Sequence, residues 1–187
     1  MSGKENTRAP IGGGRSIGQL HEQYRPKTWA DVVGQDRVIN RINTLRQRGL
    51  IGRAYWLTGA SGTGKSTIAH LIAGEVADEF GTEEIDAESL TPARVVELER
   101  SSFIRGMGDR AGRAIIINES HGLRKSTVRQ LLVTLERVSP CAVWLFTTTT
   151  EGQETLFEDC EDAHPLLSRC TVLALSRNGL AKPFAER

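Results

Sequence analysis

Short apolar runs alternate with amphipathic stretches along most of this chain. Five runs rich in β-branched or aromatic residues are predicted to be strands, at residues 54–58, 84–87, 114–117, 142–146 and 171–175. The third run, Ala114-Ile115-Ile116-Ile117, is continuously apolar, which is typical of a central parallel strand covered on both faces.

Apolar residues at helical spacing lie between these strands. One such face follows Gln35 and stops at Gly49, and another ends before Pro140. Thr91 and Pro92 are a helix start, as N-cap and first helical residue. Strands that alternate with helices predict an α/β fold, a three-layer domain with a parallel sheet.

Length and composition favour a single domain. The chain has 187 residues, of which 39% are hydrophobic and 25% charged, enough for one well-formed core. We expect a flexible tail over residues 1–19, a domain over 20–176 and a C-terminal tail over 177–187.

Charge and cysteine content limit the environment and the partners. A formal net charge of +1 gives no general attraction to nucleic acid or membrane. Since no apolar run reaches membrane-spanning length and no signal segment is visible, we expect a cytoplasmic protein without a membrane partner. Cys141, Cys160 and Cys170 lack metal-ligand spacing, so we interpret them as reduced thiols.

A glycine-rich motif joins the first predicted strand to a helical pattern. It reads Gly59-Ala60-Ser61-Gly62-Thr63-Gly64-Lys65-Ser66-Thr67. Such a loop wraps backbone N–H groups around a triphosphate, with the positive end of the helix behind it. Lys65 would contact the β- and γ-phosphates of ATP, and Ser66 would hold Mg²⁺. A glycine- and serine-rich turn that binds nothing is the alternative, which the strand-to-helix setting disfavours.

A second candidate site, Asn118-Glu119, follows the third strand. It would lie at the carboxyl edge of the sheet, where ligands of open α/β folds bind. P-loop ATPases normally carry Asp-Glu here, the Asp holding hydrated magnesium and the Glu orienting the attacking water. Asn118 can accept a hydrogen bond from a metal-bound water, but it brings no charge, so an aspartate should bind magnesium better. An ordinary strand ending is the alternative.

Hydroxyl and guanidinium groups near the last two strands are further candidates. The run Thr147-Thr148-Thr149-Thr150 follows the fourth strand, and one of its hydroxyls could reach the γ-phosphate or the attacking water. Such a run is also a common strand ending. Ser168-Arg169-Cys170 precedes the fifth strand, where an arginine is usually a solvated surface residue.

Together, in this order, the motifs resemble the clamp-loader branch of the AAA+ ATPases, the bacterial gamma/tau and replication-factor-C-type subunits. The resemblance runs from about Glu22 to Ser176. It also includes Tyr24-Arg25-Pro26 and Val33-Gly34-Gln35, which in that family line the adenine pocket.

The resemblance implies a fold and a set of roles. The fold would be an AAA+ base with five parallel strands in the order 5-1-4-3-2, working in a ring or arc of subunits. Glu119 would act on the attacking water, Thr150 would be a sensor, and Arg169 would reach in trans the γ-phosphate held by the neighbouring subunit.

Three departures limit what carries over. Asn118 replaces the magnesium-holding Asp. Leu90 and Pro92 lie near where relatives place DNA-contacting basic residues; a basic group later in the chain could contact DNA instead, or could simply be solvated. This group is His121, Arg124, Lys125 and Arg129. The sequence also ends soon after the fifth strand, so the helical lid and collar of the family are not expected in it.

The sequence therefore predicts an AAA+ module that binds ATP and Mg²⁺, with weak ATPase activity alone. Its partners by resemblance are other AAA+ subunits, a sliding clamp and primer–template DNA. A non-hydrolysing ATP-binding scaffold is the main alternative, because of Asn118 and the absent lid. A small-molecule kinase is a third, which Ser168-Arg169-Cys170 disfavours.

Overall fold

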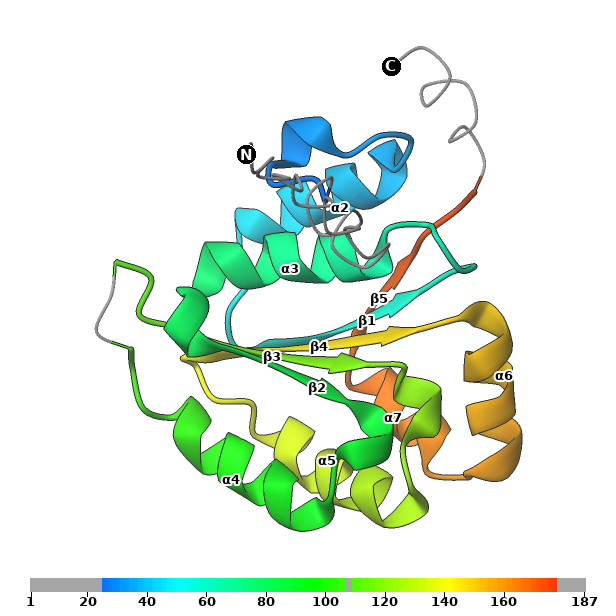
Figure 1. Cartoon of the computed structure of the whole chain (residues 1–187). Helices are drawn as coiled ribbons and strands as arrows, with labels where there is room; N and C mark the ends of the chain where they lie inside the picture. Colours follow the sequence, from blue (N-terminus) through cyan, green and yellow to red (C-terminus); the bar gives the residue numbers. More distant parts are fainter. Residues whose placement is uncertain (1–24, 107–108, 178–187) are drawn as a thin grey trace, which may run out of the picture.

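The computed structural model describes residues 25–106 and 109–177, and it has three layers (Figure 1). The central sheet is parallel, in the order β2-β3-β4-β1-β5. This confirms the predicted order, read from the opposite edge. The strands are β1 (Arg53–Thr58), β2 (Thr82–Asp86), β3 (Arg113–Asn118), β4 (Ala142–Thr148) and β5 (Thr171–Ala174).

Helices cover both faces of the sheet. α2 (Asp36–Arg46) and α3 (Lys65–Val76) lie on one face, above the sheet in Figure 1. The opposite face is covered by α4 (Pro92–Ser102), α5 (Lys125–Glu136), α6 (Thr150–Asp159) and α7 (Ala163–Ser168). Single turns of 3₁₀ helix lie at Trp29–Asp31, Glu79–Gly81, Ala87–Ser89 and Ser120–Gly122.

The alternation of side chains along β3 explains its uninterrupted apolar run. Ala114 and Ile116 pack with α2 and α3, whereas Ile115 and Ile117 pack with the helices of the other face. All four are buried. A strand that is buried on both faces needs apolar residues at every position, as the sequence predicted.

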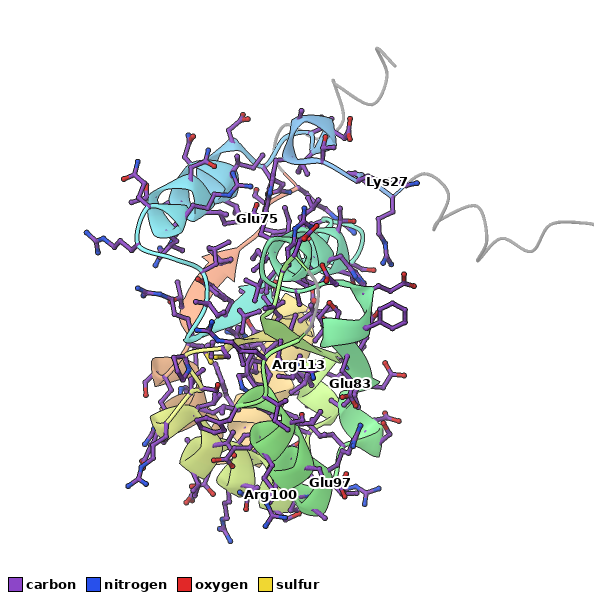
Figure 2. The ribbon with its side chains drawn as sticks, turned by 90° about the vertical axis from the view of Figure 1, so that its left-hand side faces the viewer. Lys27, Glu75, Glu83, Glu97, Arg100 and Arg113 are labelled. Carbon is purple, nitrogen blue, oxygen red and sulfur yellow. The ribbon has the colours of Figure 1, made fainter. Side chains whose placement is uncertain are left out.

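α2 is fixed to α3 by a polar cluster around Glu75 (Figure 2). The Glu75 carboxylate accepts hydrogen bonds from Arg46 and from the indole N–H of Trp29. The Arg46 guanidinium also lies 4.7 Å from the centre of the Trp29 ring. These contacts hold the segment before β1 against the helix that follows the glycine-rich loop.

Some expectations fall outside the described residues. Tyr24, the predicted tail at residues 1–19 and all of the C-terminal tail after Arg177 lie there. Within the described part, no helix combines the length and apolar character that crossing a membrane requires. Cys141, Cys160 and Cys170 are free thiols, and burial raises the pKa of Cys170 to about 12.

Candidate functional site

The loop between β1 and α3 is a tight curl that requires glycine. Gly62 and Gly64 have φ angles of 77° and 91°, which L side chains rarely adopt. At Gly59, an added Cβ would lie 2.6 Å from the carbonyl oxygen of Leu175. The loop is therefore packed against the end of β5, and its curl presents backbone groups at the carboxyl edge of the sheet.

Lys65 points back into this curl. Its Nζ donates hydrogen bonds to the carbonyl oxygens of Gly59 at 2.9 Å and Ala60 at 3.0 Å, and the residue is 9% exposed. Burial lowers the pKa of Lys65, and the carboxylates of Glu119 and Glu151 act in the opposite direction. An anionic phosphate would be a stronger partner for this ammonium than neutral carbonyls are.

Gln35 connects the phosphate loop to two other segments. Its Nε2 donates to the carbonyl oxygens of Thr63 at 3.2 Å and Ser176 at 2.8 Å, and its Oε1 accepts from the Ser176 N–H at 3.3 Å. Gln35 is 4% exposed. Gly34, with φ of 73°, turns the chain just before it. The segment that includes Val33 and Gly34 thus lies beside the phosphate loop.

One further cation lies on the phosphate loop. Arg177 donates from Nη2 to the carbonyl oxygen of Ser61 at 2.9 Å. Arg25 and Pro26, from the predicted adenine pocket, are half-buried, and Arg25 helps to lower the pKa of Glu84. Sequence reasoning missed Arg177, because it stands in the segment interpreted as a tail.

Asn118 ends β3 with both ends of its amide engaged. Its Nδ2 donates to Oε1 of Glu84 at 2.6 Å, and its Oδ1 accepts from the Thr147 hydroxyl at 3.0 Å. The other oxygen of Glu84 lies 3.2 Å from Nε2 of His70 on α3. The close approach of His70, and less strongly the hydrogen bond from Asn118, lower the pKa of Glu84 to about 2, although burial acts in the opposite direction.

Glu84 and His70 are residues that sequence reasoning missed. Glu84 lies on edge strand β2, and only the register, in which Glu84 pairs with Ile116 and Asp86 with Asn118, brings it beside Asn118. The predicted order 5-1-4-3-2 already put the second strand beside the third, but the register between them, which decides whether Glu84 lies beside Asn118, is not visible in either segment alone.

Glu119 has an unusual backbone conformation. Its φ and ψ are 48° and 49°, and it is the one non-glycine residue of the described part with positive φ. Its side chain is 60% exposed, and its Oε2 lies 3.5 Å from Nδ1 of His121. A strained backbone at the carboxyl end of a central strand is typical of functional sites.

The four threonines from the end of β4 to the start of α6 have different surroundings, and the first two belong to the strand itself. Thr147 contacts Asn118, and the Thr148 hydroxyl lies 3.4 Å from Nδ1 of His121. Thr149 is the N-cap of α6, accepting from the Gly152 N–H at 3.0 Å. Thr150, the predicted sensor, is the exposed first residue of α6. The hydroxyl that reaches Asn118 therefore belongs to Thr147.

Arg169 lies at the amino ends of the strands, opposite the carboxyl ends where the phosphate loop lies. It follows α7 and comes two residues before β5, whose Thr171 pairs with Tyr55. Its Nη2 donates to Oε1 of Glu136 at 2.8 Å and its Nη1 to the Pro165 carbonyl oxygen at 3.0 Å. A strand of this length separates it from the phosphate loop of its own chain by roughly 15–20 Å.

The candidate DNA-contacting residues do not form one continuous basic surface. Arg129 is paired with Asp162 at 2.8 Å, and His121 lies between Glu119 and Thr148. Arg124 and Lys125 are exposed at the start of α5. Leu90 is fully buried in the core, so it has a structural role.

Residues 55–175 match the model of the ATPase family associated with various cellular activities (AAA). The chain belongs to this AAA family. The match begins within β1 and ends one residue after β5.

Curated relatives of this AAA chain are the subunits that the motif order indicated. It is 29% identical over 172 residues to DNA polymerase III subunit tau of Salmonella typhimurium, covering 78% of the chain and 26% of that protein. It is 30% identical over 155 residues to the gamma/tau subunit of Mycobacterium tuberculosis, covering 70% and 27%. The replication factor C small subunit of Natronomonas pharaonis is 28% identical over 172 residues, with 90% and 50% covered.

The chain thus spans between a quarter and a half of these relatives. Two solved structures share its fold. The Holliday junction branch migration motor RuvB of Thermotoga maritima has a TM-score of 0.61 at 24% identity, covering 81% of the chain and 48% of that protein. A DNA polymerase III gamma subunit-related protein of the same organism has a TM-score of 0.60 at 12% identity, covering 82% and 49%.

Proposed function

We propose that this AAA chain is an ATP-binding module of a clamp-loader-like assembly, in which nucleotide drives the loading of a sliding clamp onto primer–template DNA. The observation that carries the proposal is the buried Lys65 ammonium inside a glycine-rich curl at the carboxyl edge of the sheet. Membership of the AAA family and the gamma/tau and replication factor C relatives support it.

The residues of the site fit a triphosphate. Lys65 would exchange its bonds to Gly59 and Ala60 for oxygens of the β- and γ-phosphates, while the N–H groups of the loop bind the remaining oxygens. Gln35 would keep the loop curled by holding the Thr63 carbonyl away from the phosphates. Val33, Gly34, Arg25 and Pro26, with Tyr24, remain the candidate contacts to adenine.

The same edge also fits magnesium. A carbonyl oxygen has two acceptor positions, and Asn118 Oδ1 uses one for Thr147, which leaves one for a metal-bound water. Ser66, at the start of α3, and Asn118 would hold the ion, which would neutralise charge on the phosphates. Glu119, exposed on its strained turn, would orient the attacking water.

Arg169 would act on the nucleotide of a neighbouring subunit. Its place across the sheet from its own phosphate loop supports a role in trans. Arg53 and Arg137 line the same surface hollow of about 360 Å³ as Arg169, so this face carries excess positive charge. An oligomer with Arg169 at the subunit interface is therefore the working form that we propose.

A protein partner such as the clamp would find exposed apolar side chains at the amino end of the sheet, where Arg113 begins β3 (Figure 2). Phe80, Phe103 and Ile104 are 96%, 55% and 63% exposed. The Arg113 guanidinium donates to the carbonyl oxygens of Ile104 at 3.0 Å and Phe80 at 3.4 Å, which holds the two segments together. This surface lies away from the phosphate loop and can be occupied together with it.

A non-hydrolysing scaffold is the second candidate function, and Asn118 is the observation that favours it. The position that normally carries a charge at the magnesium site has an amide, bound to Glu84 and Thr147. Steady-state ATP hydrolysis, measured with and without primed DNA and partner subunits, separates the two functions. Turnover that Glu119→Gln abolishes supports the ATPase, and its absence in the complete assembly supports the scaffold.

The test of nucleotide binding is Lys65→Ala. Removing a charged hydrogen-bond donor costs about 1.5–3 kcal/mol, which predicts about a 10- to 100-fold loss of affinity for a fluorescent ATP analogue. Arg100→Ala, which removes a cation from the exposed end of α4 (Figure 2), is the matched control and should leave the affinity unchanged. Equal affinities of wild type and Lys65→Ala would refute the phosphate-loop assignment.

A further inference from the structure

Asn118 lies between a carboxylate on one neighbouring strand and a hydroxyl on the other. Glu84 comes from β2 and Thr147 from β4, and β3 lies between these strands. The phosphate loop follows β1, which pairs with β4 on the side away from β3. The amide oxygen of Asn118 therefore faces the phosphate-loop side of the sheet, and the amide nitrogen faces away from it.

Glu84 determines this orientation. An ionised carboxylate only accepts hydrogen bonds, whereas a threonine hydroxyl can donate or accept. If the amide of Asn118 were flipped, its oxygen would lie against the Glu84 carboxylate, and a repulsive contact would replace a bond of 2.6 Å. Thr147 would tolerate either orientation. The side chain that keeps the Asn118 oxygen toward the phosphate loop is thus Glu84.

The pair also explains how position 118 can do without a carboxylate. An aspartate there would put a second negative charge within hydrogen-bond distance of Glu84, where like charges repel strongly. The negative charge at the carboxyl end of these strands is thus carried by Glu84 on β2 and not by residue 118 on β3. His70, one helical turn after Ser66 on α3, contacts the other oxygen of Glu84 at 3.2 Å. The carboxylate is therefore linked to the helix that carries Ser66.

We propose that Glu84 is a positioning residue of the magnesium–ATP site: it holds the Asn118 oxygen toward the metal-bound water and supplies, one strand away, the charge that Asn118 lacks. This inference rests on the proposed ATP-binding function. Residues that orient a metal ligand commonly change metal affinity about 10- to 100-fold when they are replaced.

The test measures the affinity for a fluorescent ATP analogue in Mg²⁺ and in EDTA, and takes the ratio of the two as the magnesium-dependent gain. Glu84→Gln keeps a side-chain oxygen that can accept from Asn118 and removes the charge. It should reduce the gain about tenfold and leave the affinity in EDTA unchanged. Glu83→Gln is the matched control, because Glu83 is the adjacent acid on β2 and pairs with Arg94. It should keep the full gain.

The double variant Glu84→Gln/Asn118→Asp moves the charge back to β3. We expect the double variant to restore the magnesium-dependent gain. Asn118→Asp alone should lower the melting temperature. It should also raise the gain less in the wild-type background than in the Glu84→Gln background. Two results would overturn the inference: a normal gain in Glu84→Gln, or equal effects of Asn118→Asp in the two backgrounds. Absence of Lys65-dependent binding in EDTA would instead reject the proposed function, and this inference with it.

Discussion

At the residue scale, the candidate site depends on polar side chains whose partners lie far away in the sequence. Glu84 contacts Asn118 and His70, and Lys65 is bonded to carbonyls of its own loop. The place of Lys65 at the end of the glycine-rich loop follows from the motif, because the loop is local and its glycines fix its path. The contacts of Glu84 do not, since they depend on the register of β2 against β3 and on the packing of α3 over β2.

The lowered pKa of Glu84 predicts a pH-dependent contribution to stability. A carboxyl whose pKa falls from 4.5 to about 2 on folding stabilises the native state fully above pH 4.5, and this contribution is lost as the pH falls toward 2. Glu84→Gln should therefore lower the melting temperature at pH 6, and the difference from wild type should shrink at pH 3. Thermal unfolding followed by circular dichroism at both pH values checks this, and a constant difference would contradict it.

At the scale of elements, the sequence predicts what hydrophobic periodicity or a local motif controls. The strands, the phosphate loop and the capped start of α4 follow from such patterns, and Thr91 does accept a hydrogen bond from the Arg94 N–H at 3.2 Å. The pattern did not indicate α6 and α7, because α6 has few apolar residues and α7, at six residues, is too short to show a helical period. Leu156 and Leu166, buried against the rest of the fold, anchor them.

Gln35 gives a prediction about how elements are joined. Gln35→Ala would remove the hydrogen bonds that Gln35 makes with Thr63 and Ser176, at a cost of about 1–3 kcal/mol. We expect a lower melting temperature and weaker binding of the ATP analogue, because the phosphate loop loses its tie to the segment after β5. Gln47→Ala, at the exposed end of α2, is the control and should change neither. Loss of stability with unchanged binding would show that the loop keeps its shape without Gln35.

At the scale of the whole molecule, the phosphate loop with Lys65 and the candidate finger Arg169 lie at opposite ends of the strands of one sheet. Lys65 and the phosphate loop lie at the carboxyl edge, and Arg169 lies before the amino end of β5. With Arg169 acting in trans as proposed, one chain would present half of a composite site at each end of its strands. Neither the separation nor the pairing of Arg169 with Glu136 could be read from the motif around Arg169.

Mixing two inactive variants tests this arrangement. Arg169→Ala should bind nucleotide normally and lose assembly-dependent turnover, since an arginine finger contributes about 10³–10⁵ in rate. Mixed with Lys65→Ala, it should recover part of the activity, because some interfaces then pair an intact phosphate loop with an intact finger. The control is the Arg100→Ala variant in place of the Arg169→Ala variant. It should hydrolyse ATP in the assembly without being mixed with any other variant. No recovery in a mixture that sedimentation shows to be assembled would exclude the role in trans.

If Arg169 reaches a neighbouring subunit as proposed, its ion pair with Glu136 would make subunit association a competition between two anions for one guanidinium. Glu136 is 60% exposed at its side chain, so it holds Arg169 only weakly against a more highly charged rival. A γ-phosphate on the neighbouring subunit would win this exchange, whereas a diphosphate would present no such group and leave Arg169 with Glu136. Breaking the contact with Glu136 would thus be a cost of subunit association that only a triphosphate on the neighbour can offset. Subunits would join tightly when their neighbour holds the triphosphate and separate after its hydrolysis.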